Sequence, residues 1–300
     1  MRLRYTGGVK WLTALCFLFG VIATAQTSAL PPKGGPSFDV VSIKMTAAAS
    51  QQNGGAWGNG CTSGRWSARN VNVSTVIVTA FGVLNSQVVG IPDWDSKIDH
   101  RFYITASCPP GAAAAQFRPM LQAMLVDRFH LSAHWATRDM DVRTIEVAKT
   151  GARLKPATGE CLAAAPGPPL PEGQHRCGQF YAKRLSPDGA GPFTDGALMT
   201  IHYQAWSATI ADFVAYFGRM GRINQPPMVD ETNLTGKYDF DFQYDVVTNL
   251  KDDAGNPIDQ SYKFRDALEK QLGLIDNETK LQKRPMPVVV IDHVEMPTPN

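Results

Sequence analysis

The chain has 300 residues, of which 44% are hydrophobic and 19% are charged, with 29 Lys and Arg against 27 Asp and Glu. This composition is that of a globular protein, and it excludes the disordered and collagen-like classes. Because the charges nearly balance and no run of Lys or Arg occurs, there is no electrostatic reason to expect a nucleic acid or an anionic membrane as partner.

Residues 1–25 have the pattern of a secretory signal peptide. A basic start precedes an apolar run of 13 residues, Trp11 to Ala23, and the small residues Ala23 and Ala25 offer a cleavage site. The run is shorter than the roughly 20 residues that span a bilayer, which favours a cleaved signal over a retained anchor. The sequence therefore predicts a periplasmic or secreted protein that has no membrane span once the signal is removed.

The mature chain is expected to begin with a strand at 37–44, where the sequence SFDVVSIK is alternating and β-branched. Residues 52–64 contain five glycines. They lack the preceding strand, the spacing and the following helix of a nucleotide-binding loop, so we expect a flexible loop. Residues 156–196 contain seven prolines and seven glycines, which predicts a linker or a long surface loop.

Four cysteines follow the signal peptide, namely Cys61, Cys108, Cys161 and Cys177. An even number of cysteines in an oxidising compartment predicts disulfide bonds, and four cysteines allow three pairings. Cys161 and Cys177 bracket a Pro- and Gly-rich loop, so the easiest pairing joins these two and leaves Cys61 with Cys108. A zinc site is the alternative, but it would need closely spaced ligands, and no CxxC occurs.

The segments before and after the predicted linker have the same order of elements: helix, strand pair, helix, strand pair. In the first segment these elements are expected at 72–82, 102–106, 117–125 and 140–144. In the second they are expected at 207–218, 238–242, 264–272 and 286–290. The offsets are 136 residues for the first helix end and strand, then 147 and 146. The sequence thus predicts an α+β protein made of two related repeats, 37–155 and 197–300, with helices on one face of antiparallel or mixed sheets.

Four motifs stand out along the chain: GIPDW at 90–94, LQAMLVDRF at 121–129, VDETNLTGKYDF at 229–240 and VIDHVE at 290–295. Together they resemble a family of exported proteins of unknown function that is abundant in soil bacteria. The resemblance extends from Phe38 to Asn300, although the first helix keeps the family pattern only loosely. Some members are fused to antirepressor-type membrane metallopeptidases, which implies an extracytoplasmic sensing or binding role but no reaction. Each half also resembles, more weakly, the short N-terminal module of secretins and TonB-dependent transducers, a βαβ unit that makes protein contacts.

The titratable residues form no recognisable catalytic or metal-binding motif. His130 and His134 have the spacing of zinc ligands on a helix. However, their segment follows the second helix and precedes a strand, so we expect it to be extended, and the two rings would then stand about 13 Å apart. Asp292 and His293 are neighbours along a strand and point to opposite faces, so the carboxylate is poorly placed to orient that imidazole. No serine lies in the GxSxG pattern of a nucleophile elbow.

The sequence therefore predicts a non-catalytic module that binds an extracytoplasmic protein or a small ligand, with no cofactor and no catalytic or metal-binding residues. Two alternatives stay open: a secreted hydrolase whose site is assembled in space, and a carrier of a small ligand in a cleft between the halves. The expected interaction surface consists of two turns, 90–95 and 230–236, that precede the matched strands. Its candidate residues are Trp94, Asp95, Asp230 and Thr232.

Overall fold

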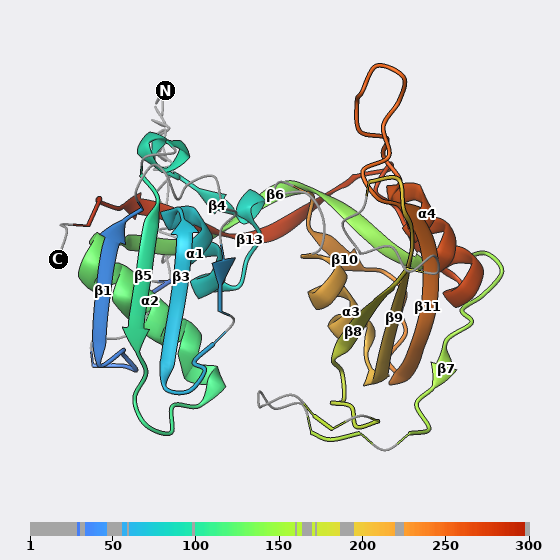
Figure 1. Ribbon diagram of the computed structural model, residues 1–300, viewed down its shortest axis with the longest axis horizontal. Coiled ribbons are helices and arrows are strands. Elements are labelled where there is room, and N and C mark those ends of the chain that lie inside the picture. Colours follow the sequence, from blue (N-terminus) through green and yellow to red (C-terminus); the bar gives the residue numbers. More distant parts are fainter. Residues whose placement is uncertain are drawn as a thin grey trace, which may run out of the picture.

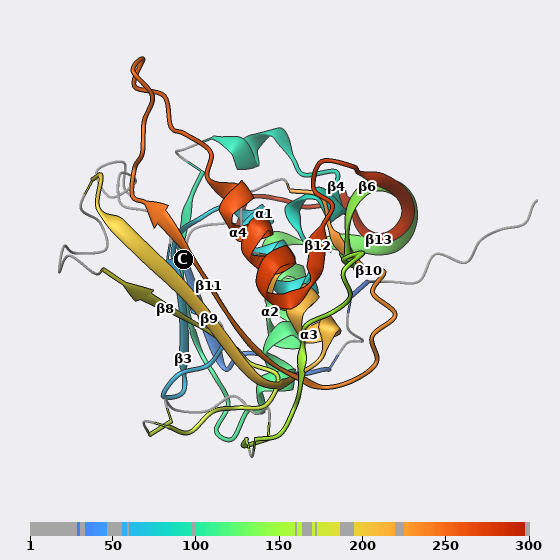
Figure 2. The same ribbon diagram turned by 90° about the vertical axis from the view of Figure 1, so that its right-hand side faces the viewer.

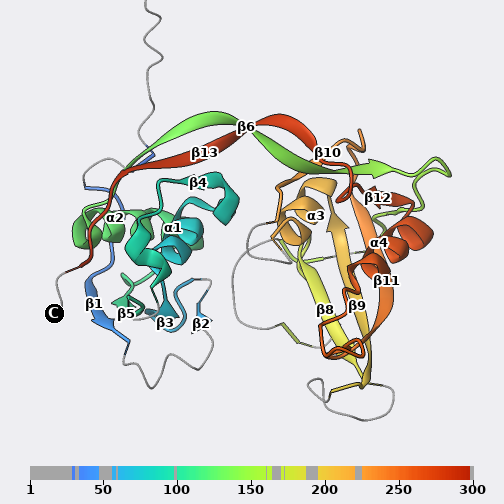
Figure 3. The same cartoon turned by 90° about the horizontal axis from the view of Figure 1, so that it is seen from above.

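The computed structural model describes residues 29–30, 34–46, 56–58, 60–97, 100–159, 161–163, 170–171, 173–186, 195–219 and 225–297. The predicted signal peptide, 1–25, lies outside these residues. The described chain forms two lobes joined by a long two-stranded ribbon, which runs over both lobes in Figure 3 and connects them in Figure 1. Helices and sheets occur in both lobes, so the fold is α+β, as predicted.

Lobe 1 is an antiparallel sheet with two helices on one face. The sheet order is β1, β5, β3, β2, with bounds β1 (Val40–Met45), β5 (Phe102–Ser107), β3 (Arg65–Val71) and β2 (Ala56–Trp57). The helices are α1 (Val73–Phe81) and α2 (Phe117–Phe129). Alternate residues of β3 and β5, such as Trp66 and Ile104, are buried and pack with the apolar stripes of both helices. Short 3-10 turns lie at Asn85–Gln87, Asp93–Ser96 and Ala114–Gln116.

Lobe 2 has a second antiparallel sheet, and Figure 2 shows its helices on one side of β9 and β11. The order is β7, β11, β9, β8, with bounds β7 (Lys155–Pro156), β11 (Tyr238–Val247), β9 (Leu198–Ala208) and β8 (Phe180–Leu185). The helices are α3 (Ile210–Phe217) and α4 (Ser261–Ala267), and α4 continues as the π-helical turn η5 (Leu268–Leu272). The core is mainly aromatic and includes Phe180, Tyr203, Phe213, Phe217, Phe240 and Phe242.

Two local expectations need correction in lobe 2. The segment 156–196, expected to be a linker or loop, contains β8, because the buried Phe180 anchors this edge strand in the aromatic core. The N-cap of α3 is Thr209, so the helix begins later than the start expected at 207. The Thr209 hydroxyl accepts a hydrogen bond from the Asp212 backbone N–H, and the Asp212 carboxylate accepts one from the Thr209 backbone N–H.

The ribbon consists of two long antiparallel strands, β6 (Ser132–Val147) and β13 (Gln282–His293). The short strands β4 (Val88–Val89) and β10 (Met228–Asp230) add to it in parallel, on β13 and β6 respectively, and β12 (Leu274–Asp276) pairs antiparallel with β6. Ala133 of β6 lies in the core of lobe 1 and Ile145 of the same strand lies in the core of lobe 2. Strand β13 returns to lobe 1, where Val289 and Ile291 are core residues. Each lobe therefore takes a strand from the other half of the chain, which boundaries at 155 and 197 do not anticipate.

Two disulfide bonds join Cys61 to Cys108 and Cys161 to Cys177, which is the pairing that the sequence favoured. The first links the loop before β3 to the residue after β5, and the second closes the loop before β8. Among the described residues, no helix is long and apolar enough to cross a bilayer.

Candidate functional site

The first turn expected to contact a partner serves to hold the start of α1. Asp95 is only 5% exposed. Its Oδ1 accepts a hydrogen bond from the Ser74 backbone N–H at 3.1 Å, and its Oδ2 accepts one from Asn72 Nδ2 at 3.2 Å. Asn72 itself makes no side-chain cap of the helix, because its Oδ1 accepts from the Thr75 hydroxyl. The carboxylate of Asp95, 23 residues away from Asn72, therefore caps the start of α1 in place of the Asn72 side chain. Trp94 packs partly buried against the core of lobe 1.

The second turn is held by its own side chains. Asp230 Oδ1 accepts hydrogen bonds from the backbone N–H and the hydroxyl of Thr232, at 2.8 and 2.7 Å. The Thr232 hydroxyl in turn accepts one from the Leu234 backbone N–H at 3.1 Å. Thr232 is buried and Asp230 is exposed. No hydrogen bond or ring contact between described residues joins this turn to Trp94 or Asp95. The two turns therefore fix the local backbone, and their buried members Asp95 and Thr232 offer a partner no surface.

The histidines near the ends of the ribbon pair with carboxylates. Glu295 lies between two imidazoles, with His130 Nδ1 2.9 Å from Oε2 and His293 Nε2 2.7 Å from Oε1. Asp292 Oδ2 lies 2.9 Å from His134 Nδ1, so Asp292 pairs across the ribbon and not with His293. Hydrogen bonds from His293 and His130 hold the pKa of Glu295 below its ordinary value.

This cluster is solvent-exposed, and the hydrogen bonds described for its imidazoles go to carboxylates and not to a serine, threonine or cysteine. In the described part of the chain no group of three His, Cys, Asp or Glu side chains could hold a metal ion. The arrangement can exchange protons with solvent, and no hydroxyl or thiol of a described residue is hydrogen-bonded to these imidazoles as an activated nucleophile would be.

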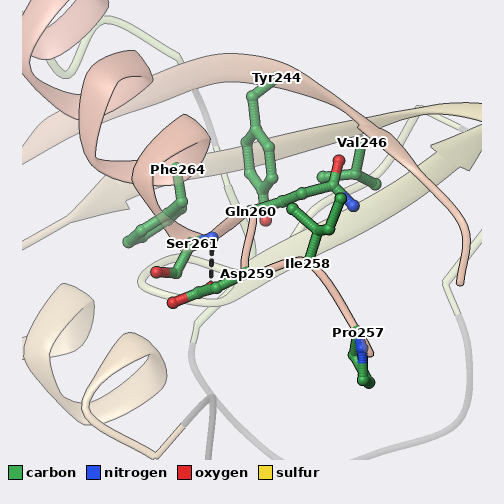
Figure 4. A pocket seen from close by; sticks show the side chains of 8 residues that line it. All are labelled: Tyr244, Val246, Pro257, Ile258, Asp259, Gln260, Ser261 and Phe264. Atoms are coloured by element: carbon green, nitrogen blue, oxygen red, sulfur yellow. Dashed lines mark hydrogen bonds between the residues drawn. The ribbon is translucent and has the colours of Figure 1, made fainter. Parts of the chain in front are cut away.

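A pocket of about 410 Å³ lies in lobe 2, at the base of the loop between β11 and α4 (Figure 4). The Tyr244 and Phe264 rings, 5.7 Å apart and edge to face, form its apolar side together with Ile258. Burial raises the pKa of Tyr244. The polar groups at the rim are already used, because Asp259 Oδ1 accepts a hydrogen bond from the Ser261 backbone N–H at 2.9 Å. The pocket is thus apolar, open and within one lobe, not in a cleft between the halves.

The face of the lobe 1 sheet that lies opposite the helices carries exposed side chains of one kind of charge. The strand register places Val40 and Lys44 of β1, Tyr103 of β5, and Arg65 and Arg69 of β3 on this face. We call these five residues the basic face. Val40 is 64% exposed and Tyr103 is 40% exposed. None of the three cations has a carboxylate partner among the described residues. The basic face thus combines unpaired positive charge with exposed apolar and aromatic surface.

The corresponding face of the lobe 2 sheet has mixed charge. Asp239, Asp241 and Asp245 alternate along β11, and the register places Lys155 beside Asp239. Asp241 is hydrogen-bonded to His202 at 2.7 Å and to Gln204 at 3.1 Å, and Asp245 accepts from the Thr200 hydroxyl at 2.6 Å. These carboxylates are therefore satisfied within their own sheet, unlike the cations of the basic face.

The free edge of the ribbon is closed to strand addition at two points. Pro285 and Pro287 interrupt β13, and the Pro287 carbonyl accepts a hydrogen bond from Gln87 Nε2 at 2.9 Å on the side away from β6. Alternate residues of a strand point their backbone N–H and C=O groups toward the same edge. Pro285 and Pro287 therefore both remove N–H donors from the edge that faces away from β6. An added strand could not pair fully along this edge of β13.

Comparison with known proteins gives one match. A family model described as a protein of unknown function (DUF3738) matches residues 74–294, from α1 to just beyond the end of β13. The match thus includes both helical layers and the whole ribbon. No curated protein and no solved structure matches the chain.

Proposed function

Because the chain belongs to the DUF3738 family of proteins of unknown function, its function must come from its own structure, and we propose that it is a non-catalytic binding module that acts outside the cytoplasm. The signal-like residues 1–25 and the two disulfide bonds support an extracytoplasmic location, periplasmic or secreted. We also propose that the protein comes from a soil bacterium, as the sequence resemblance implies.

We further propose that the two halves are repeats of one unit. The support is that the two four-stranded sheets have corresponding orders, β1, β5, β3, β2 and β7, β11, β9, β8, with the numbering advanced by six strands at each position. In both lobes a helix follows the third strand of that order directly, α1 after β3 and α3 after β9. Superposition of residues 66–148 on 201–294 tests this relation, and helices on opposite faces of the two sheets would contradict it.

The single observation that carries the proposed binding function is the basic face. Arg and Tyr are enriched where protein surfaces meet, and Tyr103 stands here among three cations that have no described counter-charge. A surface of this kind fits a protein partner that presents carboxylates, because complementary charge steers association and exposed apolar groups then bury area. The hydrolase alternative has less support, because none of the hydrogen bonds described for His130, His134 and His293 joins an imidazole to a serine, threonine or cysteine. The carrier alternative has less support, because the pocket described above lies within lobe 2.

Charge reversal tests this proposal. The mature protein and its Lys44→Glu/Arg65→Glu/Arg69→Glu variant are immobilised, and partners retained from an extracytoplasmic extract are identified and titrated against both. We expect the variant to lose retention, and we expect the affinity of the wild-type protein to fall as salt is raised. The matched control is Lys155→Glu/Lys183→Glu on the outer face of the lobe 2 sheet, which should bind as the wild type does.

Circular dichroism must show that each variant is folded. Equal retention of the same partners by the basic-face variant would contradict the proposal. Steady turnover of an ester, peptide or glycoside substrate that is abolished by His293→Ala would replace it with the hydrolase.

A further inference from the structure

Two arginine side chains from different lobes meet at Gly82, the residue that ends α1. Arg118, in the first turn of α2, lies so close that a Cβ atom at Gly82 would be 2.5 Å from its Nη1 atom. Arg219 follows the end of α3 in lobe 2, and its Nη2 donates a hydrogen bond to the Gly82 carbonyl at 2.7 Å. Both arginines are exposed. Two guanidinium groups therefore converge on one residue where the lobes come together.

These two charges lack a counter-ion in the part of the chain that the structure describes. Arg143, Arg265 and Arg284 each form an ion pair, whereas neither Arg118 nor Arg219 forms one with a described residue. Although the residue as a whole is exposed, partial burial of its guanidinium group and then the neighbouring charge of Arg118 lower the pKa of Arg219. The two guanidinium groups are thus close enough for their like charges to repel.

The helix end nearby compensates only part of this charge. Helix α1 ends at Gly82, and the C-terminus of a helix carries at most about half a negative charge. That end offsets less than one of the two positive charges, so a net positive charge is left. Gly82 is suited to this arrangement because its φ of +67° ends α1 and its missing Cβ makes room for Arg118.

The second half of the chain offers a comparison. Arg265 of α4 follows Phe264 as Arg118 follows Phe117, and Arg265 pairs with Glu278 and donates to the Ser261 hydroxyl. An acidic partner therefore neutralises the arginine in the second half. Arg118 has no such partner among the described residues, and a second arginine approaches it instead.

We propose that Arg118 and Arg219 together bind an oxyanion at the junction of the two lobes. The guanidinium fork matches the oxygens of a carboxylate or a phosphate group, and two forks from different lobes can hold one such group between them. A ligand bound there contacts both lobes through its anionic group. This proposal does not depend on the basic face, because the two sites share no residue.

The first test is titration calorimetry of the mature protein in chloride buffer with inorganic phosphate and, separately, with acetate. We expect one anion to bind per chain. Arg118→Gln and Arg219→Gln should each lower the affinity for the anion at least about tenfold, because each variant loses a charge-assisted hydrogen bond. The matched control is Arg138→Gln, an exposed arginine of the ribbon without a described ion pair, which should bind as the wild type does. Binding of phosphate alone identifies a phosphate ligand, and binding of acetate alone identifies a carboxylate.

The second test separates anion binding from a structural role of Arg118. Removing one of two repelling charges should raise the Tm of Arg118→Gln in buffer without phosphate, and it should abolish the rise in Tm that phosphate causes in the wild type. A residue that only packs on Gly82 would lower the Tm in both buffers when it is replaced. The proposal is overturned if neither anion shows saturable binding in the millimolar range, if Arg118→Gln binds with wild-type affinity, or if its Tm is lower in both buffers.

Discussion

Replacing Asp95 by Ala tests whether the turn at 90–95 holds the fold or contacts a partner. The carboxylate is buried and supplies the acceptor for the Ser74 backbone N–H at the start of α1, which no other side chain caps. Removing it leaves that N–H unpaired in the interior and removes a negative charge from the positive end of the helix. If the turn is structural, the loss is one of stability; if it is an interface, the loss is one of affinity.

The magnitude follows from these contacts. Loss of a helix N-cap costs about 0.5–2 kcal/mol. Leaving a buried donor unsatisfied costs about 1–3 kcal/mol. Both figures describe the same Ser74 N–H bond, so they are not added, and we expect Asp95→Ala to lower the free energy of unfolding by about 2 kcal/mol. A protein of this size loses about 2–4 °C of Tm per kcal/mol, which predicts a fall of about 4–8 °C. Asp95→Asn keeps one acceptor and should lose about half as much.

Urea unfolding and thermal unfolding of each variant measure these values. Asp93→Ala is the matched control, because Asp93 lies in the same 3-10 turn but is exposed, and its replacement should change the stability by less than about 0.5 kcal/mol. Equal stability of Asp95→Ala and Asp93→Ala would refute the assignment of Asp95 as the cap of α1. A loss of partner retention without a loss of stability would return Asp95 to the interaction surface.

Two further predictions concern paired charges. Asp276→Ala should lower the free energy of unfolding by about 3–5 kcal/mol, because it leaves Arg143 buried without the carboxylate that lies 2.7 Å from its guanidinium group. The double variant Arg143→Met/Asp276→Leu should recover most of that loss, as measured by urea unfolding. An Asp276→Ala variant as stable as the wild type would contradict this prediction. His293 and His130 lower the pKa of Glu295 in the folded protein. The stability that these contacts contribute is therefore present above the unfolded pKa of about 4.3 and is lost as pH falls through the lowered value. An NMR titration of Glu295 measures its pKa, and an ordinary pKa in the wild type would disprove the contacts.

The parts of the fold that could be predicted from the sequence are those whose signals are local. The helix expected at 72–82 is found at Val73–Phe81, and the strand expected at 102–106 is found at Phe102–Ser107. In both cases the period of the apolar residues is complete within about ten residues. The disulfide between Cys161 and Cys177 is local in the same sense, because only 16 residues separate its ends.

The remaining features depend on residues far apart in the chain. Strand β8 has no clear alternation of its own, and it becomes a strand because Phe180 reaches the core formed by β9, α3 and β11. Arg143 and Asp276 are 133 residues apart, and the bond from Gln87 to the Pro287 carbonyl spans 200 residues. Contacts between residues so far apart in the chain produce no periodic pattern in either segment, so they could not be predicted from the sequence of one segment alone.

The candidate site shows why turn residues were a poor guide to function. Asp, Gly, Pro and Thr occur in turns because they favour the required backbone geometry, and the same residue types occur in binding loops. Asp95 and Asp230 are interaction candidates in the sequence because their turns precede the two matched strands, but in the structure each accepts hydrogen bonds within its own turn or from a neighbouring helix. The basic face and the pair Arg118 and Arg219 become visible only when the strand register and the approach of the two lobes are known.

The exchange of strands between the lobes limits how far the lobes can move relative to each other at the junction near Arg118 and Arg219. Val289 and Ile291 from the end of the chain complete the core of lobe 1, while Ile145 from the first half completes the core of lobe 2. A chain divided at residue 155 would therefore leave both cores incomplete, and each half would expose apolar surface that the other now covers. The lobes are thus joined by buried strands as well as by the bond from Arg219 to Gly82. Because buried strands already join the lobes, an oxyanion at Arg118 and Arg219 neutralises charge at their junction, and its binding should stabilise the protein without a large rearrangement of the lobes.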